Sequence, residues 1–212
     1  MTSTSTLVAT GVALAASAQI LTEYDFIVVV DASGSMSTDD VKGRTRWAAV
    51  QETAEQFTRD LAKIDSDGIG LVIFNGQGVK SFDGVDANKL TEAFASTSPR
   101  SSTPLAEALT EALKLAGKSD KKDFIIVFTD GVPDDKAAAA QVIKDAANRQ
   151  ETDDALTILF VQVGHDALAT AYLRELDDNL KGAKFDIVDA KTVTEAEAFA
   201  TTADLVLAAI DG

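Results

Sequence analysis

Three oxygen-bearing side chains fall within five positions of the chain: Asp31, Ser33 and Ser35. They follow a run of apolar residues, 26–30, which is the pattern of a strand buried on both faces. Gly34 and the hydroxyl residues mark the point where such a strand leaves the core. A carboxylate and two hydroxyls this close together suit a hard cation or a phosphate group better than they suit a folding core.

Two more polar residues stand at comparable points. Thr103 closes a polar loop, residues 96–103, directly before Pro104. Asp130 follows a second apolar run that ends at Thr129. Each residue taken alone could be a cap or turn residue, with Asp31 and Asp130 ending strands and Thr103 capping a helix. Their joint placement favours a shared site, because ligands of parallel α/β sheets bind beyond the carboxyl ends of the strands.

The hydrophobic pattern alternates between strand and helix periodicity along the chain. Strands are expected at residues 24–30, 69–74, 79–82, 123–128, 155–163 and 185–188. Helices are expected at residues 41–64, 87–95, 105–116, 134–148, 166–179 and 192–209. This alternation predicts a doubly wound α/β fold: a mostly parallel central sheet of about six strands, with helices on both faces. The strand at 79–82 follows a hairpin-type connector and is expected to be an antiparallel edge strand. Residues 23–212 are expected to form one domain.

Composition excludes several classes of function. The net charge of the 212-residue chain is -15, which opposes binding to nucleic acid or to an anionic membrane. The chain contains no cysteine, which excludes disulfides and thiolate chemistry, and a single histidine, His165, disfavours a zinc site. His165 itself is expected in a solvated loop. Acidic character does suit the capture of cations.

Residues 1–22 carry no charge and are Ala-rich toward their end. Residues 16–19 are similar to a signal-peptidase site, but the Lys or Arg of a signal n-region is missing. The segment is also too short and too rich in polar residues to span a membrane. Two interpretations stay open: a secretory signal, which implies export, and an added arm or packing element through which the chain could form homo- or hetero-oligomers. The absence of cysteine and the incomplete signal favour the cytoplasm.

The three polar segments together resemble a known family. Asp31-x-Ser33-x-Ser35, Thr103 before Pro104, and Thr129-Asp130-Gly131 are similar to the metal-ion-dependent adhesion site of von Willebrand factor A-type domains. All five positions of that motif are filled, and the resemblance extends from residue 24 to about residue 210.

The resemblance implies a ligand set and a function. Ser33, Ser35 and Thr103 would bind a Mg²⁺, Mn²⁺ or Ca²⁺ ion through their hydroxyls, and Asp31 and Asp130 directly or through water. It further implies metal-dependent binding of a protein, in which an exposed Asp or Glu of an unidentified partner completes the shell of the ion.

The alternatives are an enzyme and an assembly subunit. A haloacid-dehalogenase-type phosphatase needs a second Asp where Ser33 stands, and the glycine pattern of a nucleophile elbow is missing before the same serine. No Walker motif occurs, and few side chains near the site could act as a general base. The sequence therefore favours a binding module over an enzyme. An adaptor in a larger bacterial assembly, for example with an ATPase, using residues 1–22 as an arm, stays as an alternative.

Other polar and aromatic residues have structural interpretations. Asp39 and Asp40 could form a second cation site, but a cap or first-turn position of the following helix is favoured. Trp47 is expected to pack against the core. Asp65, Asp67, Asp153 and Asp154 are expected in solvated turns and caps.

Overall fold

The computed structural model describes residues 19–64 and 68–212 of the chain. Most of the expected N-terminal arm, together with Asp65 and Asp67, lies outside these residues. The strands of the main sheet are β1 Tyr24–Asp31, β4 Ile69–Asn75, β5 Gly78–Val85, β6 Lys122–Thr129, β7 Leu156–Gln162 and β8 Val188–Thr192. The α-helices are α2 Arg46–Leu61, α3 Ala87–Ala95, α4 Leu105–Leu115, α5 Lys136–Arg149, α6 Ala167–Asp178, α7 Val193–Glu197 and α8 Thr202–Ile210. No helix in the described ranges is long and apolar enough to cross a membrane.

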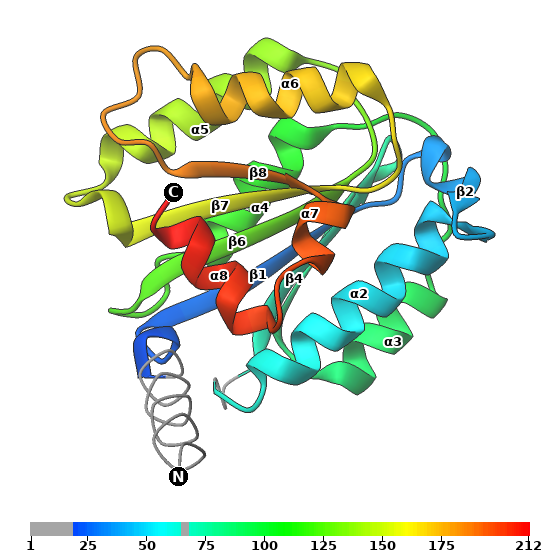
Figure 1. Cartoon of the computed structure of the whole chain (residues 1–212), viewed down its shortest axis with the longest axis horizontal. Coiled ribbons are helices and arrows are strands. Elements are labelled where there is room, and N and C mark those ends of the chain that lie inside the picture. Colours follow the sequence, from blue (N-terminus) through cyan, green and yellow to red (C-terminus); the bar gives the residue numbers. More distant parts are fainter. Residues whose placement is uncertain (1–18, 65–67) are drawn as a thin grey trace, which may run out of the picture.

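The six strands form one sheet in the order β5-β4-β1-β6-β7-β8 (Figure 1). Strand β1 pairs in parallel with β4 and β6, and β7 and β8 extend the parallel part. Only β5 is antiparallel, and it pairs with β4 at one edge of the sheet. The predicted doubly wound sheet with an antiparallel edge strand is therefore confirmed, and the apolar run 26–30 lies at its centre.

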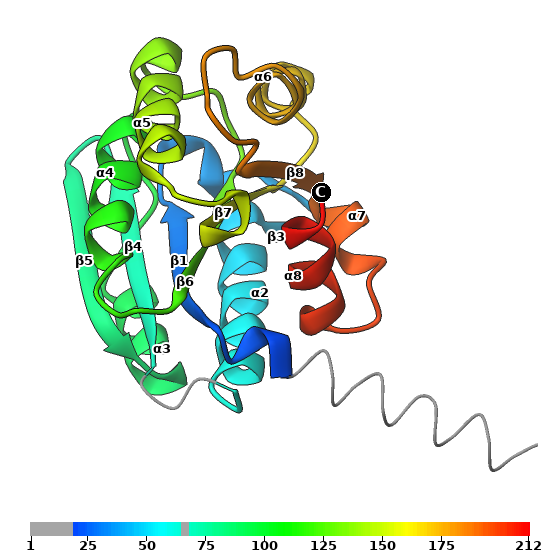
Figure 2. The ribbon, with the colours of Figure 1, turned by 90° about the vertical axis from the view of Figure 1, so that its left-hand side faces the viewer.

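Two hydrophobic cores cover the two faces of the sheet. Val28 and Val30 of β1 pack with α2, α3 and α8 on one face. Ile27 and Val29 pack with α4, α5 and α6 on the other. Figure 2 shows these two helix layers on either side of the sheet. Because side chains alternate along a strand, the central residues 26–30 of β1 are apolar on both faces, and Asp31 marks where the strand leaves the core.

The helix predicted at residues 41–64 begins later than expected. Asp39–Val41 (β2) and Arg44–Thr45 (β3) form a small antiparallel hairpin instead. Its turn has left-handed backbone at Lys42, with φ of 52°, and at Gly43, with φ of 75°, which a helix cannot continue through. Helix α2 then starts at Arg46, and the side chain of Thr45 caps it by accepting from Ala48 N.

The C-terminal prediction was also wrong in its boundaries. The last strand, β8, covers residues 188–192 instead of 185–188 and pairs with β7. The helix expected at residues 192–209 is two helices, α7 and α8. Thr192 and Glu195 form a capping box that starts α7, and Thr201 caps α8. Two consecutive cap signals therefore divide a segment that hydrophobic periodicity alone had joined.

Candidate metal centre

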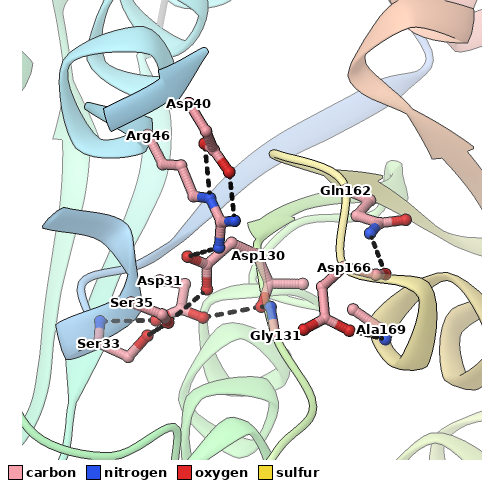
Figure 3. Close-up of polar contacts among 11 residues, drawn as sticks. Asp31, Ser33, Ser35, Asp40, Arg46, Asp130, Gly131, Gln162, Asp166 and Ala169 are labelled. Atoms are coloured by element: carbon pink, nitrogen blue, oxygen red, sulfur yellow. Dashed lines mark hydrogen bonds and ion pairs between the residues drawn. The ribbon is translucent and has the colours of Figure 1, made fainter. Parts of the chain in front are cut away.

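The candidate site lies at the carboxyl ends of β1 and β6, the two central strands. Asp31 is the last residue of β1, and Asp130 follows the last residue of β6 directly. The two strands are neighbours in parallel register, with Val30 beside Phe128, so both carboxylates emerge at the same edge (Figure 3). Both side chains are buried, with 0% and 1% of the residue exposed.

Both oxygens of the Asp31 carboxylate are held by neighbours. Oδ1 accepts a hydrogen bond from the backbone N of Ser33 at 2.7 Å, and Oδ2 accepts from the Thr129 hydroxyl at 2.7 Å. Burial raises the pKa of Asp31 to about 6, while the hydrogen bonds from Thr129 and Ser33 oppose that rise. Within residues 19–64 and 68–212, no basic side chain forms an ion pair with this carboxylate.

A chain of hydroxyls connects the loop after β1 to the second carboxylate. After β1 the polypeptide forms a short 3-10 helix, Gly34–Ser37. Ser33 is its N-cap residue, and Ser35 lies within it. Their Oγ atoms are 3.1 Å apart, and the Ser35 hydroxyl donates to Asp130 Oδ1 at 2.7 Å. Four of the five residues predicted to form a site, Asp31, Ser33, Ser35 and Asp130, are thus joined in one hydrogen-bonded group (Figure 3).

Thr103, the fifth residue of the predicted site, is held in position by hydrogen bonds of its backbone. Its N donates to Asp134 Oδ1 at 3.1 Å, and Asp134 N donates to Thr103 O at 3.0 Å. The same loop is tied to the loop after β1, because Gly34 N donates to Ser101 O at 3.0 Å. Thr103 does not cap α4: Pro104 occupies the N-cap position, and no side chain caps that helix end. The alternative in which Thr103 is a helix cap is therefore wrong.

The structure adds one residue to the site that the sequence interpretation missed. Arg46, the first residue of α2, donates from Nη1 to Asp130 Oδ2 at 2.9 Å. It also makes a two-pronged contact with Asp40, through Nε at 2.9 Å and Nη2 at 2.5 Å. Asp40 and Asp130 both raise the pKa of Arg46, and the pKa of Asp40 is lowered in return. One guanidinium thus bridges an exposed and a buried carboxylate.

The helix-cap interpretation of Asp39 and Asp40 was wrong. Both residues lie in β2, and Asp40 faces Arg46 across the hairpin instead of capping a helix. A sequence signal for this ion pair was present: Asp40 precedes Arg46 by six residues, and Gly43 lies in the turn between them. The interpretations of His165 and Trp47 are confirmed: His165 is exposed in a loop, and Trp47 packs against Phe94 in the core, with ring centroids 4.8 Å apart and ring planes tilted by 45°.

The predicted site contains few acidic side chains. Within the described parts of the chain, no group of three or more His, Cys, Asp or Glu side chains could hold a metal ion. The predicted site has two carboxylates, and its remaining donors are hydroxyls. The arrangement is therefore one of oxygen donors alone, at the position where a doubly wound sheet accepts ligands.

These features define a class of α/β domain with a polar site at the carboxyl edge of its two central strands. A family model of the von Willebrand factor type A domain matches residues 26–132, half of the chain, including all five site positions. The chain therefore belongs to the von Willebrand factor type A family. A search of curated proteins finds no match.

Several solved structures share the fold. The SpRpn10 VWA domain has a TM-score of 0.60 and 12% identity, over 86% of this chain and 93% of that one. The manganese-loaded TRAP protein of Plasmodium vivax has a TM-score of 0.58 and 18% identity, over 82% and 71%. The pilus adhesin SpaC of Lactobacillus rhamnosus GG has a TM-score of 0.55 and 19% identity, over 89% of this chain and 30% of that one. At such identities the likeness shows the fold.

Proposed function

We propose that this chain is a divalent-metal-dependent protein-binding module. Asp31 and Asp130, with the hydroxyls of Ser33, Ser35 and Thr103, would hold Mg²⁺, or alternatively Mn²⁺ or Ca²⁺. The bound ion supplies a positive charge and a coordination position that an Asp or Glu carboxylate of a partner protein fills. The proposal assigns binding, and no catalysis, to the site.

The observation that carries this proposal is the environment of Asp31. This carboxylate is fully buried, lies beside the buried Asp130, and has no ion-pair partner among the described residues. A buried carboxylate is costly unless a cation or several hydrogen bonds compensate its charge. Of the two buried carboxylates, Arg46 pairs with Asp130, whereas Asp31 has hydrogen bonds from Ser33 N and Thr129 but no positive charge, which a bound cation would provide.

The chemistry of the donors fits a hard cation. All five side chains offer oxygen, without nitrogen or sulfur, and Mg²⁺, Mn²⁺ and Ca²⁺ prefer oxygen ligands. The hydroxyls of Ser33 and Ser35 are neutral, so the site itself keeps at most two negative charges and leaves a dication able to attract a further carboxylate. The TRAP structure is described as manganese-loaded, which motivates including Mn²⁺ among the ions tested.

Thermal unfolding in the presence of each ion tests metal binding. After removal of metal with a chelator, Mg²⁺ or Mn²⁺ should raise the Tm by mass action. Asp31→Ala should abolish that rise. Because Asp31 is buried and its loss could unfold the protein, Ser35→Ala at the exposed Ser35 provides a second test, with Ser37→Ala in the same short helix as the matched control. An undiminished rise in Tm in both Asp31→Ala and Ser35→Ala would contradict the assignment.

Partner binding is tested separately. Capture of a protein partner from cell extract should be lost when the chelator is present and restored by excess Mg²⁺. Capture that the chelator does not change would show that the ion is not the contact. Turnover of a generic phosphate ester that is lost in Asp31→Asn would contradict the assignment of a binding role without catalysis.

A further inference from the structure

A polar pocket of about 350 Å³ opens beside the candidate metal centre. Its walls are the β4–β5 hairpin, including Gln77 and Lys80, and the loop after α3, including Ser98 and Arg100. Strand β4 is the parallel neighbour of β1, with Phe74 beside Asp31. The pocket therefore lies on the same edge of the sheet as the candidate metal centre, next to it on the side of β4.

The pocket is positively charged although the protein is strongly negative. Of the described residues that line it, Lys80 and Arg100 are the charged ones, and none is an Asp or Glu. Neither Lys80 nor Arg100 is part of an ion pair among the described residues. Within the described parts of the chain, the Arg100 guanidinium makes two long hydrogen bonds, each of 3.4 Å, to Ser98 O and Gln77 Oε1. Most of its five donors thus remain available to a ligand.

The backbone couples this pocket to the metal-site loop. Arg100 N donates to Ala32 O at 2.9 Å, directly between Asp31 and Ser33. Ser101, the next residue, accepts from Gly34 N and has left-handed backbone, with φ of 63°. Arg100 is therefore held at a fixed position relative to the proposed cation, although its side chain is exposed.

We propose that this pocket receives a second acidic residue of the partner protein. The partner would then be an extended acidic segment, with one carboxylate on the metal ion and another between Lys80 and Arg100. This inference rests on the function proposed above and specifies its partner. Charge complementarity supports this proposal. In a chain of net charge -15, the side chains of Lys80 and Arg100 have no ion-pair partner among the described residues, and they lie beside a site that is itself proposed to bind a carboxylate.

The strand spacing sets the separation of the two acids. Neighbouring strands are about 4.8 Å apart, so the pocket between β4 and β5 lies roughly 10 Å from a site between β1 and β6. An extended peptide advances about 3.3 Å per residue and its side chains alternate between two faces, so two acidic residues on the same face should be separated by one or three intervening residues. Planar, two-pronged recognition by Arg100 suits a carboxylate in this segment.

Synthetic peptides provide the probe. One fluorescent peptide carries a single Asp in a Gly/Ser sequence, and a series carries two Asp residues with increasing numbers of residues between them. Fluorescence anisotropy measures binding to the full chain with Mg²⁺ or with chelator. We expect the best two-acid peptide to bind about five- to tenfold more tightly than the single-acid peptide, with an optimum near the spacing above.

Charge-removing variants locate the second contact. Lys80→Ala and Arg100→Ala should reduce binding of the two-acid peptide to the single-acid level and leave single-acid binding unchanged. Lys181→Ala and Arg149→Ala are the matched controls, because Arg149, the last residue of α5, and Lys181, which follows the end of α6, are exposed and do not line this pocket. They should change neither affinity.

The two proposals fail in different ways. Metal-dependent binding of the single-acid peptide without any gain from a second Asp would overturn the pocket and leave the proposed function intact. A gain that Lys80→Ala and Arg100→Ala do not reduce would also overturn it. Binding of both peptides that the chelator does not change would instead overturn the metal-dependent function. Absence of binding by either peptide at millimolar concentration would overturn both.

Discussion

Arg46 Nη1 lies 2.9 Å from Oδ2 of Asp130, a carboxylate whose side chain has no exposed surface. The pair joins the start of α2 to the end of β6, 84 positions apart in the sequence. Because Ser35 holds the other oxygen of Asp130, that carboxylate is fixed from both sides. Arg46 thus places a permanent positive charge beside the oxygen donors of the proposed site.

Replacing Arg46 should therefore make the protein more dependent on metal. Arg46→Met leaves the buried Asp130 without its ion pair and should lower the free energy of unfolding, without metal, by about 2–4 kcal/mol. Mg²⁺ should restore more stability to this variant than it adds to the wild type, because the ion no longer competes with a guanidinium charge. Urea unfolding with and without Mg²⁺ measures both effects.

The control for that experiment is Arg59→Met on the same helix. Arg59 is half exposed and faces Glu55 at 3.7 Å, so its loss should cost less than about 1 kcal/mol. If Mg²⁺ increases the free energy of unfolding equally in Arg46→Met and in the wild type, the guanidinium and the ion do not compete near Asp130.

Gly164 makes room for the Arg46 side chain. It has φ of +79°, and a Cβ at this position would lie 2.5 Å from Arg46 Nε. Gly164→Ala should lower the free energy of unfolding by about 1–2 kcal/mol from backbone strain, with a further loss from displacement of the guanidinium. In the Arg46→Met background only the strain should remain. A double-mutant cycle in urea measures the difference, and strictly additive losses would show that the two residues do not interact.

The positions of Asp31 and Asp130 could be predicted because each lies at the end of an apolar run, with Thr129 between that run and Asp130. Such runs identify central parallel strands, and the carboxyl ends of neighbouring parallel strands meet at one edge. The register of β1 and β6 confirms that placement. The contact of Arg46 could not be predicted in the same way, because it joins distant segments and depends on the small hairpin before α2. Helical periodicity instead predicts a helix that begins at residue 41.

The lower accuracy at the C-terminus has a related cause. Periodicity indicates which residues face the core, but α7 and α8 both face it, so the pattern continues across the break between them. The break depends on the Thr201 hydroxyl, which accepts from Asp204 N, and a single cap is a weaker signal than a hydrophobic stripe.

Gly76 allows the β4–β5 hairpin to pack against the loop that carries Thr103. A Cβ at Gly76 would lie 2.3 Å from the Ser101 hydroxyl oxygen and 2.7 Å from Ser102 N. Gly76→Ala should displace this loop and weaken the rise of Tm with Mg²⁺ by moving Thr103. Adding Ser101→Ala should recover the response in part, because it removes the closest contact but leaves the backbone contact. If Gly76→Ala keeps the full rise of Tm with Mg²⁺, binding of the ion does not depend on the position of the loop that carries Thr103.

Thr129 should matter to the site through its hydroxyl alone. Its Oγ1 donates to Asp31 Oδ2 at 2.7 Å in a fully buried position. Thr129→Val keeps the shape but leaves the carboxylate short of a donor, which should cost about 1–3 kcal/mol of folding free energy. Thr129→Ser retains the hydroxyl and should lose less. If Thr129→Ser loses stability in urea unfolding and Thr129→Val loses none, packing of the methyl group, and not the hydrogen bond, explains the role of Thr129.

Asp123 gives the protein a stability that depends on pH away from the site. Burial raises the pKa of its carboxyl to about 6, while the hydrogen bonds from Gly117 N, at 3.1 and 2.9 Å, oppose that rise. Since the folded pKa exceeds the unfolded value of about 4, its contribution is fully present below about pH 4 and is lost as the pH rises through 6.

Asp123→Asn should remove that dependence, since the amide stays neutral and can still accept from Gly117 N. The free energy of unfolding of the variant should equal that of the wild type near pH 4 and exceed it by about 1–2 kcal/mol at pH 7. This difference is reduced by solvent screening because Asp123 is partly exposed. Urea unfolding at a series of pH values between these limits measures the difference. Asp120→Asn, at an exposed neighbouring residue, should differ from the wild type by the same small amount at each pH. A pH-independent difference for Asp123→Asn would show that burial does not destabilise the ionised carboxylate.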